Sequence, residues 1–471
     1  MFSVISSRSV TATAATRRGP GWTVGFASAA MLVSYLPFSA VNGSLGILSD
    51  ATRASTSDLQ WLTDAFALAL AVTVLPAGAV SERLGRRATV VLGLALIALG
   101  AVIGLTAGGS PGPVAIPLLW AAQAVAGVGG GAVMSASLAL ITAAAPDVPA
   151  RRRGIAIWAA AVTCGLGVGP FLAAAVIETV GLRWLFAPIL VLAVATGATG
   201  HFLVPEPLSA RRSSVDVAGM LLSALTVGAV VAAVIRAGST GWSDAFVVEM
   251  LAIALVGLAA FLLREHRAAD PVLPLTMFSS RRFTAAGLAA ATMLFSIVGA
   301  VFVLSLLLDC DGDSEIGIAL QLGCLFAANA VASLAAATLQ ARIGAARVLG
   351  GGLFVAAAGA AFLATAGEYD VAHLAWRLAL FGLGSGLVMS TASALAVSDL
   401  PPASAGPAGA ANNALRQLGA ALGAAVLGSV LAAQLTSQDF TSAVRTCLLV
   451  LTGVLTVTAV TCTALLLPRR R

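Results

Sequence analysis

The chain has 471 residues, of which 59% are hydrophobic and only 10% are charged, and its formal net charge is +6. Its mean hydropathy is +0.99. A soluble globular protein carries about 25% charged residues because water must solvate its surface. This chain has too few charges for such a surface, so its composition excludes a cytosolic enzyme, a secreted domain and a disordered regulator. It predicts an all-α membrane protein whose surface faces lipid.

Fourteen apolar segments are long enough to cross a bilayer core, which needs about 20 residues per helix. In chain order they are 24–48, 61–81, 88–107, 116–144, 155–177, 184–204, 217–238, 245–263, 283–308, 316–339, 347–366, 372–397, 407–432 and 446–467. An even number of crossings places both termini on the same side of the membrane.

The arginines indicate which side that is. With both termini inside, 20 arginines fall in inner segments and 4 in outer ones, which is the bias that cytoplasmic loops show. We therefore expect a multi-pass protein of the cytoplasmic (inner) membrane with both termini cytoplasmic. Residues 1–20 are interpreted as a cytoplasmic tail. An organelle transit peptide is the alternative, because Met1–Arg18 is rich in Ser and Thr and lacks acids.

The residue types present exclude several kinds of site. All 26 basic residues are arginine, and a chain without lysine forms neither a Walker P-loop nor a Schiff base. Five cysteines have no recurring spacing, so neither a disulfide framework nor a metal knuckle is indicated. His201, His266 and His373 lie far apart and no Ser or Cys motif accompanies them. We expect no enzyme activity, no metal, no cofactor and no nucleic-acid partner.

An internal repeat divides the chain. The pattern Gly-x-Gly-x-Gly-x-x-Met-Ser occurs at 127–135 and again 255 residues later at 382–390, and Arg-x-Gly ends the second and tenth spans. Parallel repeats of this size relate the two halves of many secondary transporters, whereas the alternative is chance similarity between glycine-rich membrane helices. The repeat predicts a tail (1–20), an N-terminal six-helix bundle (21–205), a two-helix insertion with cytoplasmic loops (206–275) and a C-terminal six-helix bundle (276–471).

The segment 78–87 resembles a known motif. It is similar to the loop between helices two and three of the major facilitator superfamily, which usually has Asp where this chain has Glu82. A carboxylate beside arginines at a helix end can latch one conformation and release in another. The residues that carry the resemblance are Gly78, Glu82, Arg83, Gly85, Arg86 and Arg87.

Other segments resemble the fourteen-helix drug:proton antiporter branch of that superfamily. Gly165, Gly169 and Pro170 are similar to the motif typical of its exporters, and the stretches 182–184, 264–275 and 412–419 also look like this branch. The resemblance implies the major facilitator fold, two six-helix bundles plus two extra transmembrane helices. It further implies a monomeric secondary active transporter that exports amphipathic or drug-like molecules by proton antiport with alternating access.

Two positions depart from the branch. Pro37 stands near the position of the helix-one Asp, and Gln123 stands at the position of the helix-four Arg. Both groups are often tied to proton coupling in the branch. Their replacement favours the alternative function, a proton-uncoupled facilitator or lipid flippase of the same fold.

Charged residues inside a membrane span are candidates for function because their burial is costly. Asp64 is the expected protonation site, and Arg377 or Arg416 is expected to sense its charge by proximity. The alternative is that Asp64 caps or anchors a helix start near Trp61.

Polar and aromatic residues near the middle of the spans could line a substrate cavity. The alternative is that the amides bond between helices and the aromatics pack. They are Tyr35, Asn42, Phe66, Trp120, Gln123, Trp158, Gln321, Asn329, Trp376, Asn412 and Asn413.

Overall fold

The computed structural model describes residues 20–54, 56–110, 112–206, 216–268, 271–273, 275–310, 315–366, 371–398, 405–435 and 439–467. Apart from Pro20, the predicted tail 1–20 lies outside the described residues. Within them, fourteen helices are long and apolar enough to cross a membrane, which confirms the predicted number of spans.

The long helices are α1 (Pro20–Asn42), α3 (Thr56–Leu84), α4 (Arg86–Ala107), α5 (Gly112–Ala144), α6 (Val148–Val180), α7 (Ala187–Leu203), α8 (Val217–Thr240), α9 (Ala245–Arg267), α10 (Arg281–Cys310), α11 (Glu315–Ile343), α12 (Ala345–Ala364), α13 (Val371–Ala396), α14 (Ala405–Gln434) and α15 (Phe440–Leu466). Short elements are α2 (Leu45–Thr52) and the 3₁₀ turns η1 (Leu182–Trp184) and η2 (Leu275–Ser279).

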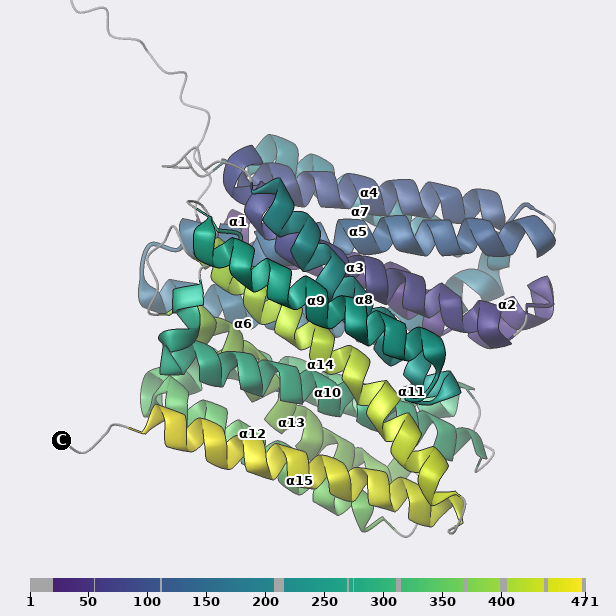
Figure 1. Cartoon of the computed structure of the whole chain (residues 1–471). Coiled ribbons are helices and arrows are strands. Elements are labelled where there is room, and N and C mark those ends of the chain that lie inside the picture. Colours follow the sequence, from purple (N-terminus) through teal and green to yellow (C-terminus); the bar gives the residue numbers. More distant parts are fainter. Residues whose placement is uncertain are drawn as a thin grey trace, which may run out of the picture.

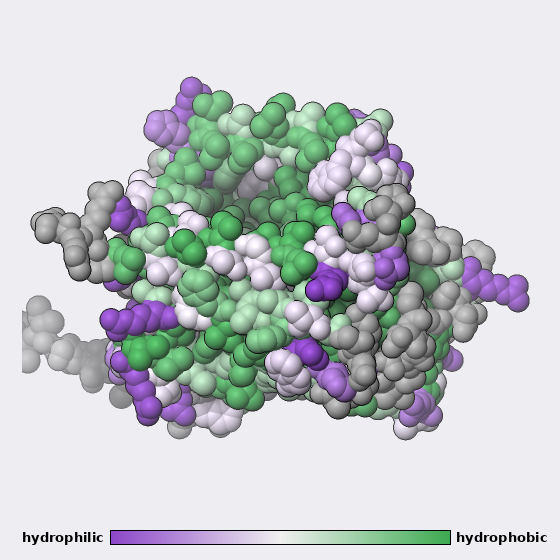
Figure 2. Space-filling model, turned by 90° about the horizontal axis from the view of Figure 1, so that it is seen from below, coloured by the Kyte–Doolittle hydropathy of each residue, from purple (hydrophilic) through white to green (hydrophobic). Residues whose placement is uncertain are grey.

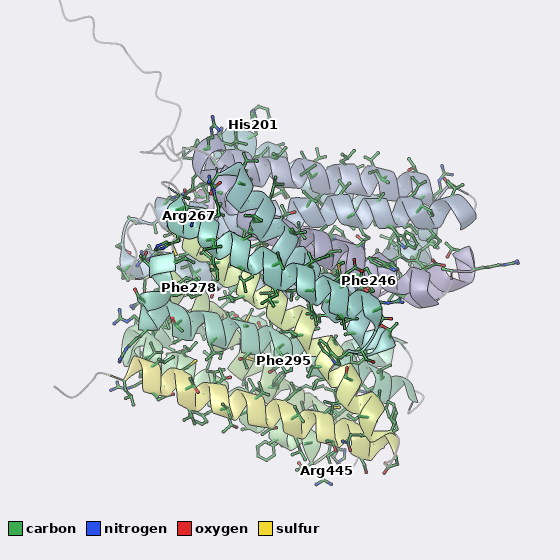
Figure 3. The ribbon with its side chains drawn as sticks, in the orientation of Figure 1. His201, Phe246, Arg267, Phe278, Phe295 and Arg445 are labelled. Atoms are coloured by element: carbon green, nitrogen blue, oxygen red, sulfur yellow. The ribbon has the colours of Figure 1, made fainter. Side chains whose placement is uncertain are left out.

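The helices lie roughly parallel to one another, so the protein has two end faces. We call the end at which α1 begins and α15 ends the terminal face, on the left in Figure 1, and the other end the opposite face. Arg267 lies at the terminal face and Arg445 at the opposite face (Figure 3). On the face seen in Figure 2, hydrophobic residues predominate between the two ends, as a lipid-facing protein requires.

Two groups of six helices have the same internal arrangement. In the first group, α5 packs against α3 and α4, α4 against α7, and α1 against α6. In the second group, α13 packs against α11 and α12, α12 against α15, and α10 against α14. The first group lies above the second in Figure 1. The expected pair of six-helix bundles is therefore present.

The repeated glycines occupy the same place in both bundles. A methyl group added to Gly127 of α5 would overlap the carbonyl oxygen of Phe66 on α3, and one added to Gly382 of α13 would overlap that of Leu325 on α11. Without a hydrophobic force between helices in lipid, such close backbone contact is what holds helices together. The repeat predicted from the sequence is therefore a packing repeat.

The helix ends repeat as well. Gly85 follows α3 with a φ of 101°, and Gly344 follows α11 with a φ of 89°. L-residues rarely adopt this part of backbone space, whereas glycine does so readily. The same sharp turn therefore joins the second and third helices of each bundle.

The two inserted helices are not attached to one bundle alone. α8 packs against α3 of the first bundle and α14 of the second, and α9 packs mainly on α8. Figure 1 shows α8 and α9 lying across these two helices. Towards the opposite face, Trp242 Nε1 donates a hydrogen bond to Ser429 Oγ of α14 at 3.1 Å. The insertion therefore bridges the bundles, which its position between them in the sequence did not reveal.

An ion pair joins α8 to α9 at the terminal face. Arg264 Nη2 lies 3.0 Å from Asp216 Oδ1, and Arg264 Nε lies 3.0 Å from Asp216 Oδ2. Burial opposes ionisation of Asp216, but hydrogen bonds from Arg264 and from the Gly219 N–H outweigh it, so the pKa of Asp216 lies below its usual value. A neighbouring acid, Glu265, accepts hydrogen bonds from the backbone N–H groups of Val272 and Leu273 at 3.2 and 3.0 Å.

This ion pair predicts a pH dependence of stability. A carboxylate with a lowered folded-state pKa stabilises the protein above its unfolded pKa of about 3.9, and this contribution is lost as the pH falls through the folded value. The melting temperature of the purified parent should therefore fall between about pH 5 and pH 3 more steeply than that of Asp216→Asn. Equal slopes for the two proteins would contradict the stabilising role of the pair.

Candidate functional site

α14 carries the polar contacts between the bundles. Asn413 Nδ2 donates a hydrogen bond to the carbonyl oxygen of Met134 on α5 at 3.3 Å. Gln417 Nε2 donates to the hydroxyl oxygen of Tyr35 on α1, also at 3.3 Å. Residues four apart lie on the same helix face. One face of α14 therefore hydrogen-bonds to two helices of the other bundle.

Arg416 lies beside these contacts, inside the span Gly406–Gln434. It is 11 residues from the start of α14, or about 16 Å along the helix, and the side chain is only 1% exposed. Its guanidinium lies 5.7 Å from the ring centroid of Trp158 on α6, and its Nη1 donates to Asn413 Oδ1 at 3.2 Å. Trp158 is itself fixed, because its Nε1 donates to Ser137 Oγ at 2.9 Å.

The charge of Arg416 is not balanced by an acid. Among the described residues no carboxylate forms an ion pair with it, and its Nε has no hydrogen-bond partner. One helical turn away, Asn412 is fully buried and neither atom of its amide has a partner within the described part of the chain. Buried polar groups nearly always have hydrogen-bond partners. The unpaired atoms of Arg416 and Asn412 are therefore available to bind a ligand.

A second polar contact joins the bundles through α6 and α11. Thr163 Oγ1 donates to Asn329 Oδ1 at 2.6 Å, and Asn329 Nδ2 donates to Ser385 Oγ of α13 at 2.6 Å. We call this contact and the α14 contacts together the polar seam, made of Tyr35, Met134, Trp158, Thr163, Asn329, Ser385, Asn412, Asn413, Arg416 and Gln417. Five of the predicted cavity residues and Arg416 meet there.

The two positions that depart from the branch contact each other. Gln123 Nε2 donates to the carbonyl oxygen of Pro37 at 3.2 Å, and Gln123 is fully buried. A hydrogen bond between two uncharged residues therefore occupies the two positions at which the antiporter branch usually has an Asp and an Arg. Nearby in the first bundle, Phe66 packs on Phe38 with ring centroids 5.4 Å apart, and Trp120 Nε1 donates to the backbone oxygen of Asp58 at 3.0 Å.

The remaining predicted cavity residues lie away from the polar seam. Asn42 is exposed at the end of α1 and donates to Phe38 of its own helix. Trp376 is 48% exposed on α13, where it packs against Phe362 with ring centroids 5.3 Å apart. Gln321 is buried on α11.

The three charged residues predicted for proton coupling are not gathered in one place. Arg377 donates to the backbone oxygen of His373 and lies 4.7 Å from the ring centroid of Trp376. Asp64 is half-buried on α3, and no described side chain forms an ion pair or hydrogen bond with its carboxylate. In this conformation neither arginine is paired with Asp64.

The loop motif fixes the terminal end of the first bundle. The carboxylate of Glu206 accepts hydrogen bonds from the backbone N–H groups of Arg87 and Ala88 at 3.1 and 3.0 Å, and it pairs with the Arg87 side chain at 3.5 Å. An anion at a helix N-terminus is stabilised by the unpaired N–H groups and the helix dipole. No motif in the sequence pointed to Glu206, which follows the sixth span.

The same motif also meets the second bundle. A methyl group added to Gly78 would lie 2.7 Å from the Cβ atom of Ala410 on α14, and one added to Gly406 would lie 3.3 Å from Glu82 Oε1. Arg86 Nη1 donates to the carbonyl oxygen of Ala139 on α5 at 3.2 Å, while Arg83 is exposed. Through these contacts α14 closes against α3 at the terminal face.

The predicted exporter motif lies on α6 where it packs against α1. Ser39 Oγ donates to the carbonyl oxygen of Gly165 at 2.8 Å, a methyl group on Gly169 would collide with Ser39, and Pro170 lies against Gly43. The second bundle has an equivalent pair, Gly419 and Gly423 of α14, which contact the backbone of Ala291 and Phe295 on α10. The glycine spacing of four was visible in the sequence, but its symmetry with α6 was not recognised.

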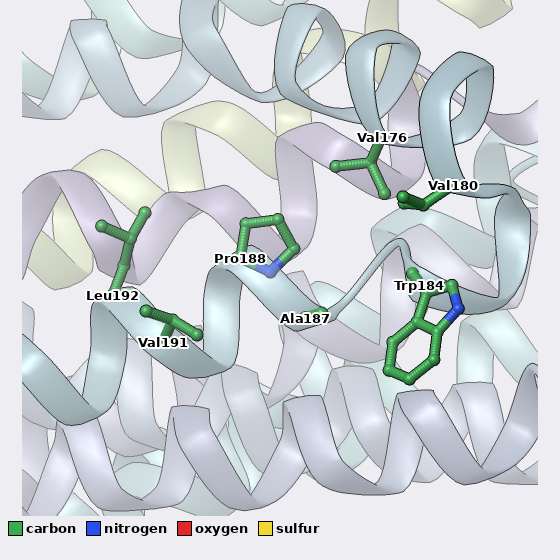
Figure 4. Close-up of a pocket in the computed structure, with 7 residues that line it drawn as sticks. All are labelled: Val176, Val180, Trp184, Ala187, Pro188, Val191 and Leu192. Atoms are coloured by element: carbon green, nitrogen blue, oxygen red, sulfur yellow. The ribbon is translucent and has the colours of Figure 1, made fainter.

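An apolar hollow on the outer surface is separate from the polar seam. Side chains of α6, η1 and α7, including Val180, Trp184 and Pro188, line it near the opposite face (Figure 4). It opens outwards, and its lining is almost entirely apolar.

Comparisons with known proteins identify the family. The model described as Major Facilitator Superfamily matches residues 27–218 and 203–424. The multidrug resistance protein Stp of Mycobacterium tuberculosis is 30% identical over 402 residues, which are 84% of this chain and 73% of that protein. The tetracenomycin C resistance and export protein of Streptomyces glaucescens is 30% identical over 389 residues, 81% of this chain and 70% of that protein.

Solved structures agree on the fold. The human organic anion transporter MFSD10 is 17% identical with a TM-score of 0.69, covering 94% of this chain and 100% of that one. The proton:xylose symporter XylE is 16% identical with a TM-score of 0.68, covering 94% of each chain. Both are transporters of the fold that the resemblance implied, which confirms the expected fold class.

Glu206 provides a test of the terminal anchor. Glu206→Ala removes the acceptor of two backbone hydrogen bonds and one ion pair, so it should destabilise the protein by about 1.5–3 kcal/mol, seen as a lower melting temperature of the purified protein. Glu178→Ala, which removes an exposed acid at the opposite end of α6, is the matched control and should change little. Equal melting temperatures for the two variants would show that Glu206 does not anchor α4.

Proposed function

The chain belongs to the major facilitator superfamily, and on this premise we propose that it exports amphipathic or drug-like small molecules across the cytoplasmic membrane by proton antiport. It is a transporter and not an enzyme. The observation that carries the proposal is the polar seam, which has a buried cation and unpaired amide atoms between two symmetric bundles, inside a membrane-spanning helix. The relatives named for multidrug resistance and for drug export support export as the direction.

Alternating access follows from the way the bundles touch. Each bundle is held internally by backbone contact at glycines, whereas between the bundles the seam uses a few side-chain hydrogen bonds. Side-chain hydrogen bonds across helices are worth about 0.6 kcal/mol each in membranes. The bundles can therefore separate without losing their internal packing, which is what alternating access requires.

The orientation belongs to the same proposal. Positive charge gathers on cytoplasmic loops, so we assign the terminal face, which carries Arg83, Arg86 and Arg87, to the cytoplasm. The contact of Gly78 with Ala410 then closes the cytoplasmic side. The conformation is then one that is closed on the cytoplasmic side, and the transporter acts as a monomer.

Asp64 is the group proposed to exchange protons. It is an ionisable side chain inside a span, half-buried and without a partner among the described residues, and such groups mark proton relays in transporters. Arg377 and Arg416 are proposed to respond to its charge when the bundles move. They do so through changes in distance, because an arginine keeps its own proton.

The alternative function is a facilitator or lipid flippase without proton coupling. The neutral contact of Gln123 with Pro37 favours it, because neither group can take up or release a proton near physiological pH. The two functions differ in whether a proton gradient drives export.

A vesicle experiment tests the proposal. Inverted vesicles with an imposed pH gradient should accumulate ethidium or 9-anthracenecarboxylate, and a protonophore should abolish this. Asp64→Asn should lose most of the gradient-driven accumulation, while Asp58→Asn, six residues earlier on α3, should keep it.

The outcomes separate the alternatives. Transport by Asp64→Asn that equals the parent and still depends on the gradient would exclude the proton role of Asp64. Parent transport that a protonophore leaves unchanged would favour the uncoupled alternative. No transport of either probe above vesicles without the protein would contradict export of this class of compound.

A further inference from the structure

We propose that Arg416, Asn412 and Tyr35 form a subsite for the anionic group of the substrate, so that the transported molecules include amphipathic organic monoanions such as aromatic carboxylates. This inference rests on the proposed function and names a substrate class for it. It also gives Arg416 a role in binding, in addition to the response to Asp64 proposed above.

Arg416 lacks a counter-charge among the described residues. Arg416 is 1% exposed in the middle of a span, where an arginine is costly and usually pairs with an acid or with backbone carbonyls. Its one described hydrogen-bond acceptor is the neutral amide oxygen of Asn413. The ring face of Trp158 attracts the cation, but the Nε–H group of Arg416 has no hydrogen-bond acceptor among the described residues. One positive charge therefore remains unbalanced at the seam.

Asp64 does not supply the missing negative charge beside Arg416. Gly78 of α3 lies level with Ala410 of α14, and the two helices run in opposite directions. Arg416 is then level with position 72, so Asp64 is displaced from it by about 12 Å along the helix axis. Among the described residues no carboxylate forms an ion pair with Arg416, and Tyr35 is held beside it by Gln417, the next residue of α14.

Hydrogen-bond donors around this charge have no acceptor among the described residues. Arg416 Nε and Asn412 Nδ2 are both buried N–H donors without an acceptor within the described residues. Tyr35 accepts a hydrogen bond from Gln417 through its hydroxyl oxygen, so its own O–H is free to donate. A cation with neighbouring donors suits the oxygens of a carboxylate or an ionised enol.

The surroundings define the rest of the ligand. A single arginine balances one negative charge, which favours a monoanion over a phosphate with two charges. The indole of Trp158 is held in place by Ser137 and gives an aromatic wall beside the charge. The seam is closed in this conformation, so the anion enters only when the bundles separate.

Binding to the purified protein in phosphatidylcholine nanodiscs tests the inference at neutral pH. The probes are 9-anthracenecarboxylate and its uncharged methyl ester, which share the aromatic body and differ in charge. The parent should bind the carboxylate at least ten-fold more tightly than the ester. Arg416→Gln should remove this preference, and Arg416→Lys should retain part of it because the charge remains.

Control variants separate a local role from loss of fold. Arg236→Gln, on α8 towards the opposite face, should leave the preference unchanged. Asn412→Leu removes an unpaired donor and no charge, so it should weaken carboxylate binding several-fold, and it keeps the inference testable if Arg416→Gln does not fold.

Three results would overturn the inference. They are equal binding of carboxylate and ester by the parent, an unchanged preference in Arg416→Gln, and absence of carboxylate binding by the parent. Displacement of the probe by phosphatidylglycerol added to the nanodiscs would assign the subsite to an anionic lipid headgroup instead. Export of ethidium without binding of the carboxylate would refute this inference and leave the proposed function intact.

Discussion

The contact of α14 with the opposite bundle is the interaction on which this structure depends. In lipid, apolar side chains gain little by leaving the surrounding hydrocarbon, so helices associate through close packing and hydrogen bonds. α14 uses both. Its glycines hold it to α10 within its own bundle, and Asn413 and Gln417 hydrogen-bond to α5 and α1 of the other. α14 is thus part of the second bundle and also forms the seam between the two bundles.

This division explains how a chain with few charged residues can move as two bodies. Glycines let the helices within each bundle touch along their backbones, and this close packing keeps each bundle in shape. The seam relies on side chains that can exchange hydrogen-bond partners. Because the buried Arg416 has no counter-charge, an anion that reaches the seam changes the stability of the closed conformation. α8 adds a constraint, because it contacts α3 and α14 at once and must follow both bundles when they separate.

The sequence predicted the features that depend on local composition. Span number follows from hydropathy and length, and the repeat follows from glycines, since only glycine permits the contacts of Gly127 and Gly382. What it could not predict is which face a residue occupies, because spans that are apolar all round give no periodic signal. Trp376 and Asn42 therefore fell outside the seam, and the bridging position of α8 was missed. Long-range pairs such as Glu206 with Arg87 leave no local pattern either.

The most direct test of two bundles moving about the polar seam is a pair of distances measured by electron spin resonance. In a cysteine-free background, one pair of spin labels replaces Arg83 and Arg342 at the terminal face, and the other replaces Thr106 and Thr365 at the opposite face. Both pairs occupy equivalent positions of the repeat. Changing the pH or adding a transported compound should lengthen one distance and shorten the other. Distances that stay fixed, or that change together in the same direction, would contradict the account.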